Sequence, residues 1–354
     1  MAACIVVIIP ILIKIKNKNK GNGNIGLDSS YKRVKYDDPD FFYIPIVATN
    51  NIQGKFYQEI KKNIYKFGGL EYLSRYINIL RDEFGKNRVL YLDAGEYYNK
   101  EIENNNNINN KIDKFFNYID LKATILDESY VNIKKEINNQ NYLIFSDVSE
   151  RYKIYKIQLI NGDIINIGVI GIYIKKDKNY LLDELAKNIT LYIKELREKG
   201  ANGIILLSNL DIQCIDAQLK LDIISNHKQL CDKYSTSNTS ILRILEKSEK
   251  KPDVVIICNS NNIEIHHWEQ GIPIMSSPWN GKYFNIMYLP FKKNNNNNYI
   301  LNKNEIKIEG PLPICEKIFR DTKICDDIIE SKTNELITYS WHDKKIYKDP
   351  NFKI

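Results

Sequence analysis

Histidine is scarce in this chain, and paired cysteines are missing. Four histidines occur among 354 residues, and six cysteines are scattered without a single Cys-x-x-Cys pair. The cysteine pattern excludes zinc ribbons and thioredoxin-type redox sites. The shortage of imidazole restricts any metal or acid–base chemistry that depends on histidine. The histidines are His227, His266, His267 and His342.

A concentrated excess of charge is also missing. Lysine and arginine together number 51 against 44 aspartates and glutamates, a net charge of +7 that is spread along the chain. Nucleic-acid binding requires clustered positive charge, so we expect no nucleic-acid partner. Hydrophobic residues make up 43% of the chain, which is enough to form a core and excludes wholesale disorder.

Long apolar runs are absent, with one short exception at the start. Residues 2–13 are apolar but interrupted by Pro10, and a membrane-spanning helix needs about 20 apolar residues. We therefore expect no transmembrane segment. One interpretation of residues 1–20 is an atypical signal peptide, which makes the protein secreted; the alternative is an unprocessed start. Residues 21–40 read as a disordered polar lead-in, and the lysines between Lys14 and Lys35 form either a solvated tail or a contact with acidic membranes or polyanions.

Strand-like and helix-like patterns alternate along the rest of the chain, which predicts an α/β fold. Asparagine tracts at 104–110 and 294–298 are typical of surface loops. The expected strands are 42–48, 89–92, 164–172, 204–207 and 254–257, and the expected helices are 70–84, 182–196 and 241–248.

The polar segments that follow these strands form an ordered series of motifs. They read T-N-N-I-Q-G-K-F from Thr49, G-G-L from Gly68, L-D-A-G-E from Leu92, S-N-L from Ser208, C-N-S-N from Cys258, and G-I-P-I from Gly271 leading to G-K-Y from Gly281. The series resembles the metallophosphatase domain of the 5'-nucleotidase and apyrase family. The family motifs are T-N-D-x-H-G-R-F, G-G-L, L-D-A-G-D, S-H-x-G, G-H-x-H and G-x-P-V…G-K-Y.

This resemblance implies a four-layer metallophosphatase sandwich, in which two mixed β-sheets pack face to face with helices outside. It assigns residues 41–345 to that domain. The family's C-terminal nucleotide-binding domain, which stacks the base between aromatic side chains, is expected to be absent from this chain.

The resemblance also implies that the metal-ligand positions have lost their ligands. The positions that hold Asp or His in the family are here Asn51, Gln53, Glu96, Asn209, Asn259 and Asn261. Amides are neutral and cannot act as acids or bases near neutral pH. The family's G-N-H-E motif falls near residues 123–130, where no Asn-His pair occurs in any register. We therefore expect no catalytic residue and no resident metal.

The expectation from sequence is a catalytically inactive 5'-nucleotidase-like protein. It would bind a nucleotide or phosphate ligand in the relict site, or a protein partner by its surface. Lys55, Asp127 and Glu128 are weaker candidates for ligand binding. The alternative is an active, divalent-metal-dependent nucleotide phosphohydrolase whose oxygen-only site holds Ca²⁺ or Mg²⁺. Glu96 also has a plain structural interpretation, as a solvated or lysine-paired residue in a turn.

Overall fold

The computed structural model describes most of the chain between residues 41 and 314. The described residues are 41–55, 59–61, 65–96, 111, 114–125, 151–174, 182–210, 212, 240–258, 265–269, 271–277 and 281–314. The predictions for residues 1–40, for the first asparagine tract and for the end of the domain lie outside them.

Strands and helices alternate as the sequence predicts. The strands are β1 (Phe41–Thr49), β2 (Glu59–Lys61), β3 (Tyr65–Phe67), β4 (Leu90–Asp93), β5 (Leu121–Thr124), β6 (Tyr152–Gln158), β7 (Ile164–Ile172), β8 (Gly203–Ser208), β9 (Val254–Ile257), β10 (Ile265–Glu269), β11 (Ile272–Ser276), β12 (Tyr283–Lys293), β13 (Tyr299–Leu301) and β14 (Lys307–Pro313). The helices are α1 (Leu70–Phe84), α4 (Leu182–Glu198), α5 (Ile241–Lys247) and the 3₁₀ helix η3 (Lys303–Glu305). The three predicted helices are confirmed as α1, α4 and α5.

The strands form two mixed sheets and a small ribbon. The first sheet has the order β13-β12-β1-β4-β5, with β14 also paired to β12, and the second has the order β10-β11-β9-β8-β7-β6. Strands β1, β4 and β5 are parallel to one another, as are β7, β8, β9 and β11. Strands β2 and β3 pair with each other alone.

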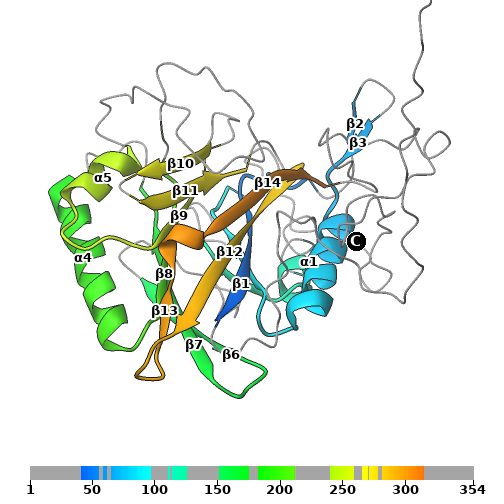
Figure 1. Cartoon of the computed structure of the whole chain (residues 1–354). Helices are drawn as coiled ribbons and strands as arrows, with labels where there is room; N and C mark the ends of the chain where they lie inside the picture. The colour runs from blue at the N-terminus through cyan, green and yellow to red at the C-terminus, as the bar shows by residue number, and fades with distance from the viewer. Residues whose placement is uncertain are drawn as a thin grey trace, which may run out of the picture.

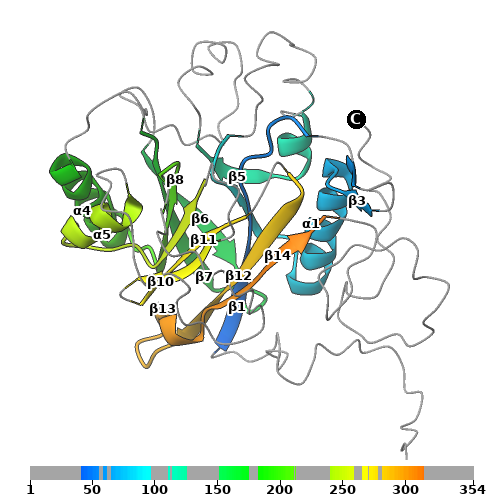
Figure 2. The same cartoon turned by 90° about the horizontal axis from the view of Figure 1, so that it is seen from above.

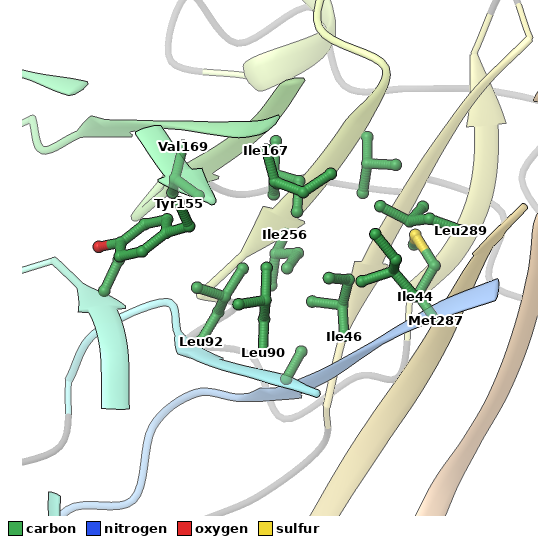
Figure 3. Close-up of a cluster of buried hydrophobic side chains, with 14 of the residues drawn as sticks. Ile44, Ile46, Leu90, Leu92, Tyr155, Ile167, Val169, Ile256, Met287 and Leu289 are labelled. Carbon is green, nitrogen blue, oxygen red and sulfur yellow. The ribbon is translucent and has the colours of Figure 1, made fainter. Parts of the chain in front are cut away.

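The two sheets pack face to face through alternating apolar side chains. One buried cluster draws Ile44 and Ile46 from β1, Leu90 from β4, Ile167 from β7 and Ile256 from β9. Figure 3 shows side chains of the two sheets meeting in this layer. Because successive side chains of a strand point to opposite faces, the other residues of these strands must find a different partner.

Helices cover those outer faces. On the first sheet, Val47 packs in a second cluster with Leu73 and Ile77 of α1. On the second sheet, Ile204 and Leu206 of β8 join a third cluster with α4 and α5. Figures 1 and 2 show α1 on one side of the sandwich and α4 with α5 on the other. The four-layer arrangement is therefore confirmed, and it explains why these strands are apolar along their whole length.

The two ends of the sandwich have different characters. Thr49, Asp93 and Ser208 terminate strands β1, β4 and β8 at one end. At the opposite end, the β6–β7 and β12–β13 hairpins turn (Figure 1). The second asparagine tract, 294–298, lies in the β12–β13 turn, so its prediction as a loop is confirmed. In folds of this kind, ligands gather at the carboxyl ends of parallel strands.

Candidate functional site

The carboxyl ends of the strands bring the two sheets into contact. Asn50, directly after β1, forms two hydrogen bonds with the backbone of Ser277 behind β11: its Nδ2 donates to the carbonyl at 3.0 Å, and its Oδ1 accepts from the amide at 2.7 Å. The Cys258 thiol, directly after β9, lies 3.5 Å from the carbonyl oxygen of Gly95. Loops from both sheets therefore meet at this end.

A buried carboxylate holds the loop after β4. Asp93 aligns with Thr49 on β1 and with Thr124 on β5. Both threonine hydroxyls donate to it, at 2.6 Å and 3.2 Å, and the Gly95 amide donates at 2.8 Å. The single hydroxyl hydrogen of Thr49 goes to Asp93, so Tyr91, whose hydroxyl lies 2.6 Å from Thr49 Oγ1, donates to Thr49. Every carboxylate oxygen of Asp93 thus has a donor inside the protein.

Burial shifts the acidity of this network. Desolvation raises the pKa of Asp93 from 3.8 to about 7, against the opposing effect of its hydrogen bonds from Thr49, Gly95 and Thr124. The pKa of the Tyr91 phenol is raised for the same reason, with a further contribution from the nearby Asp93 charge. Asp93 is therefore the group at this end whose charge state changes near neutral pH.

Three of the predicted ligand positions have left-handed backbone conformations. The φ angles of Asn51, Gln53 and Glu96 are 55°, 48° and 53°, a region that costs most L-residues about 1–2 kcal/mol. Two backbone hydrogen bonds link the loops: the Asn51 amide donates to Gly95 at 2.8 Å, and the Gln53 amide donates to Glu96 at 3.1 Å. The two loops fix each other's shape and keep these three residues adjacent.

Gly281 explains how a further loop packs against them. Its φ is 65°, and a Cβ there would lie 3.3 Å from Ile52 Cγ2 and 3.5 Å from the carbonyl oxygen of Ile52. A side chain would therefore crowd the loop that carries Asn51 and Gln53. The glycine of the G-K-Y motif is required by this close approach, together with its left-handed backbone.

Cys258 occupies the position where the family motif G-H-x-H begins with glycine. Its side chain is 2% exposed and lies against Glu96 and the Asn51 backbone. Desolvation raises the pKa of this thiol well above its usual value, and the charges of Glu96 and Asp93 raise it further. The group is a neutral thiol that fills space between the two sheets. We call Asn51, Gln53, Glu96 and Cys258 the strand-end site.

The side-chain amide of Asn209 is hydrogen-bonded to the backbone. Its Oδ1 accepts from the Ile174 amide at 2.8 Å, and its Nδ2 donates to the Ile174 carbonyl at 2.8 Å. The residue follows β8, next to the end of β9, as predicted, but its amide bridges β8 to the segment after β7. The sequence does not reveal this role, because the partner is backbone.

The predicted site residues therefore divide into three groups. Asn51, Gln53 and Glu96 are brought together, and Asn209 lies at a neighbouring strand end with its amide used. Lys55 follows Gln53 in the same loop, where its backbone amide donates to Ile52 at 3.0 Å. The remaining candidates lie outside the described residues: Asn259, Asn261, Asp127 and Glu128.

The donor set at the described positions does not fit a pair of divalent cations. A dimetal phosphatase centre holds two ions about 3.5–4 Å apart with charged carboxylates and imidazoles around them. Of the four described positions, Glu96 alone carries a charge, and both polar atoms of the Asn209 side chain are already bonded. In the part of the chain that the structure describes, no three His, Cys, Asp or Glu side chains cluster as a metal site.

One acceptor at this end has no donor. Asn51 is 1% exposed, and no donor in the described chain bonds its Oδ1. A buried acceptor without a partner costs about 1–3 kcal/mol. The strand-end site thus contains an unbonded acceptor, Asn51 Oδ1, and a carboxylate, Glu96, which lies near the neutral thiol of Cys258.

Solved structures with a similar arrangement include proteins described as a calcineurin-like phosphoesterase and a 5'-nucleotidase. The calcineurin-like phosphoesterase YfkN from Bacillus subtilis superposes with a TM-score of 0.52 at 15% identity, covering 76% of this chain and 91% of that one. This chain has a metallophosphatase fold. A protein described as a 5'-nucleotidase from Staphylococcus aureus gives a TM-score of 0.55 at 11% identity, covering 77% of this chain and 54% of that chain.

A third structure with the metallophosphatase fold is the sulfate thiohydrolase SoxB from Thermus thermophilus, with a TM-score of 0.51 at 11% identity, covering 76% of this chain and 56% of that chain. The chain spans about half the length of the Staphylococcus and Thermus proteins. No protein-family model and no curated protein sequence matches it. At these identities the likeness establishes the fold, and it confirms the fold that the motif series predicted.

Proposed function

We propose that this protein is a non-hydrolytic relative of the 5'-nucleotidases that binds a ligand at the strand-end site. The observation that carries the proposal is the donor set: one carboxylate and three amides stand at the four described ligand positions, and the Asn209 amide is fully used by Ile174. Neutral amides compensate little cationic charge. Glu96 has no neighbouring imidazole among these positions to share acid–base work.

The backbone conformation of the strand-end loops supports the proposal that the site still binds a ligand. Gln53 and Glu96 hold left-handed conformations, each at a cost of about 1–2 kcal/mol that ordinary turns would avoid. Asn51 adopts the same region more readily, because asparagine tolerates it. Strain of this kind gathers where a ligand is held. The loops therefore support a site whose shape still matters.

The chemistry of the acceptors narrows the ligand class. An amide oxygen and a carboxylate bind hydroxyl or amino groups and repel the oxygens of a phosphate. The nucleoside part of a nucleotide therefore fits the described residues better than inorganic phosphate does. Its ribose hydroxyls or base amino group would satisfy the buried Asn51 Oδ1.

Calorimetry with adenosine, AMP and phosphate tests the proposal, beside a phosphatase assay with Mg²⁺ and Ca²⁺. We expect saturable adenosine binding that Asn51→Gly weakens at least tenfold, since glycine keeps the left-handed backbone but removes the acceptor. Asn295→Ala, in the exposed β12–β13 turn, is the control and should bind normally. Absence of adenosine binding would refute the proposal that the site binds a nucleoside. Phosphate release from AMP that needs a divalent ion and disappears in Glu96→Gln would instead establish a working hydrolase.

Export of the protein belongs to this proposal as well. The apolar run at residues 2–13 supports a leader, whereas no helix among the described residues combines the length and the apolar character needed to cross a bilayer. Mass spectrometry of protein secreted from a eukaryotic host would locate the new N-terminus, and retention of Met1 in the cell would argue against export.

A further inference from the structure

Exposed apolar side chains gather at the end of the sandwich opposite the strand-end site. Ile160 and Ile164 in the β6–β7 hairpin are 73% and 51% exposed, and Ile300 in β13 is 54% exposed. These three are the majority of the five large hydrophobic residues exposed in the described chain, the others being Tyr118 and Leu191. Single exposed isoleucines are ordinary on a protein surface, but three at one end of the sandwich indicate a binding surface.

The two hairpins are held together rigidly. The Tyr299 hydroxyl donates to Asp163 Oδ2 at 2.7 Å, and Lys293 pairs with the same oxygen at 2.9 Å. Asn161 Nδ2 donates to Asp163 Oδ2 at 2.9 Å. Figure 1 shows the two turns side by side at the bottom of the molecule. The isoleucines therefore lie at fixed positions on the two joined hairpins, and we call these three residues the hairpin edge (Ile160, Ile164 and Ile300).

Positive charge accompanies the hairpin edge. Lys292 is exposed and lies directly across from Ile300 in the β12–β13 pair. Lys156 is exposed on β6, two residues from the position that pairs with Ile164. The carboxylate in these hairpins, Asp163, is neutralised by its ion pair with Lys293. Within the two hairpins, the exposed lysines therefore carry positive charge that no carboxylate of these hairpins offsets.

The N-terminal segment joins the fold at this same end. Phe41, the first residue of β1, pairs with Lys292, which in turn pairs with Ile300. The 40 residues that precede it include the apolar run 2–13 and lysines at positions 14, 16, 18 and 20. Membrane binding by this segment is therefore the alternative that an experiment on the hairpin edge must exclude.

We propose that the hairpin edge docks on an anionic lipid bilayer, with the three isoleucines entering the headgroup boundary and Lys156 and Lys292 facing acidic lipids. Apolar anchors beside lysines are the combination that binds membrane surfaces. The strand-end site then points away from the membrane and stays open to solvent.

The placement of the isoleucines favours a fluid surface over a folded partner. Strand neighbours alternate between faces. Because Ile165 is buried between the sheets, Ile164 lies on the outer face of its sheet. Tyr299 and Leu301 are buried between the sheets as well, so Ile300 lies on the outer face of the other sheet. A second protein would have to contact the outer faces of both sheets to cover Ile164 and Ile300, whereas lipid chains adapt to such a shape.

Co-sedimentation of the full chain with vesicles tests this proposal. One set of vesicles is pure phosphatidylcholine, and the other contains about a third phosphatidylserine. We expect binding to the anionic vesicles that weakens at least tenfold in a variant with Ile160→Thr, Ile164→Thr and Ile300→Thr, and about tenfold in Lys156→Gln with Lys292→Gln. Threonine preserves the β-branched shape that strands prefer. Leu191→Gln, on α4 and 50% exposed, is the matched control and should bind as the wild type does.

Each alternative occupant gives a distinct result. Equal binding to both vesicle types, or no binding to either, refutes the proposal. Full binding by the isoleucine variant, with binding lost when lysines 14, 16, 18 and 20 become glutamine, assigns the contact to the N-terminal segment alone and also refutes it. A dimer in light scattering that the isoleucine variant dissociates, without vesicle binding, shows that the edge meets a second copy of the chain.

Discussion

Asp93→Asn should remove a pH dependence that is built into the fold. In the folded protein the pKa of Asp93 is about 7, against 3.8 for an ordinary aspartate. Between these values the folded state holds a proton that the unfolded chain has released. Linkage then requires that the free energy of unfolding decreases as pH rises from about 4 to 7, and levels off above that.

The size of the effect follows from the pKa difference. Each pKa unit corresponds to about 1.4 kcal/mol, so Asp93 accounts for at most about 4 kcal/mol across the whole range. Roughly 2 kcal/mol of this falls between pH 5 and pH 7. That is a large part of the total stability of a typical domain, which is about 5–15 kcal/mol. Asparagine does not titrate, and its amide oxygen can still accept from the Gly95 amide as Asp93 does at 2.8 Å.

Urea unfolding at pH 5, 6, 7 and 8 measures this prediction. The quantity of interest is the difference in unfolding free energy between Asp93→Asn and the wild type, because other titrating groups cancel in it. We expect the difference to shift by about 2 kcal/mol in favour of the variant from pH 5 to pH 7. Parallel pH profiles for the two proteins, or a wild type that gains stability relative to the variant as pH rises, would refute the buried acidic network.

Three further predictions test the backbone and polar contacts. Gln53→Gly should raise the unfolding free energy by about 0.5–1 kcal/mol, because glycine relieves a φ of 48°; Gln53→Ala in the same urea experiment should bring no gain. Asn209→Ala should cost about 1–3 kcal/mol by urea unfolding, since both backbone groups of Ile174 lose their partner. A smaller loss would mean that water replaces the amide. Asp253→Asn breaks the ion pairs with Arg197 at 2.5 Å and with Lys303 at 2.7 Å and should lower the unfolding free energy by about 1–3 kcal/mol; Arg197→Lys alone, which keeps a cation beside Asp253, should lower it less.

Periodicity and apolar runs predicted the helices α1, α4 and α5 and five of the 14 described strands (β1, β4, β7, β8 and β9), because the patterns that they measure are the patterns that packing uses. Leu73 and Ile77 recur at helical spacing and pack in the cluster between α1 and the first sheet. Strands β5, β6, β12, β13 and β14 were among those not identified. Tyr283 to Lys293 mixes polar and apolar residues, and its role emerges only from pairing with β1 and β14. Pairing over such distances leaves little trace in local sequence.

The candidate site was predictable as positions but not as contacts. Motif spacing placed Asn51, Gln53 and Glu96 at neighbouring strand ends, and the structure brings them together. The sequence motifs did not indicate that Cys258 would lie against Glu96. Long-range neighbours of this kind are fixed by the packing of the two sheets, which a single sequence does not encode in any short segment.

The scaffold keeps its shape because its own polar groups, and not a ligand, hold the loops at the strand ends. Asp93 takes its donors from Thr49, Thr124 and the Gly95 amide, and the Asn51 amide bonds Gly95. The cluster between the sheets contains none of the predicted ligand positions. The apolar core between the sheets is therefore separate from the side chains at those positions. Such separation allows ligand residues to change while the fold stays recognisable at 11–15% identity.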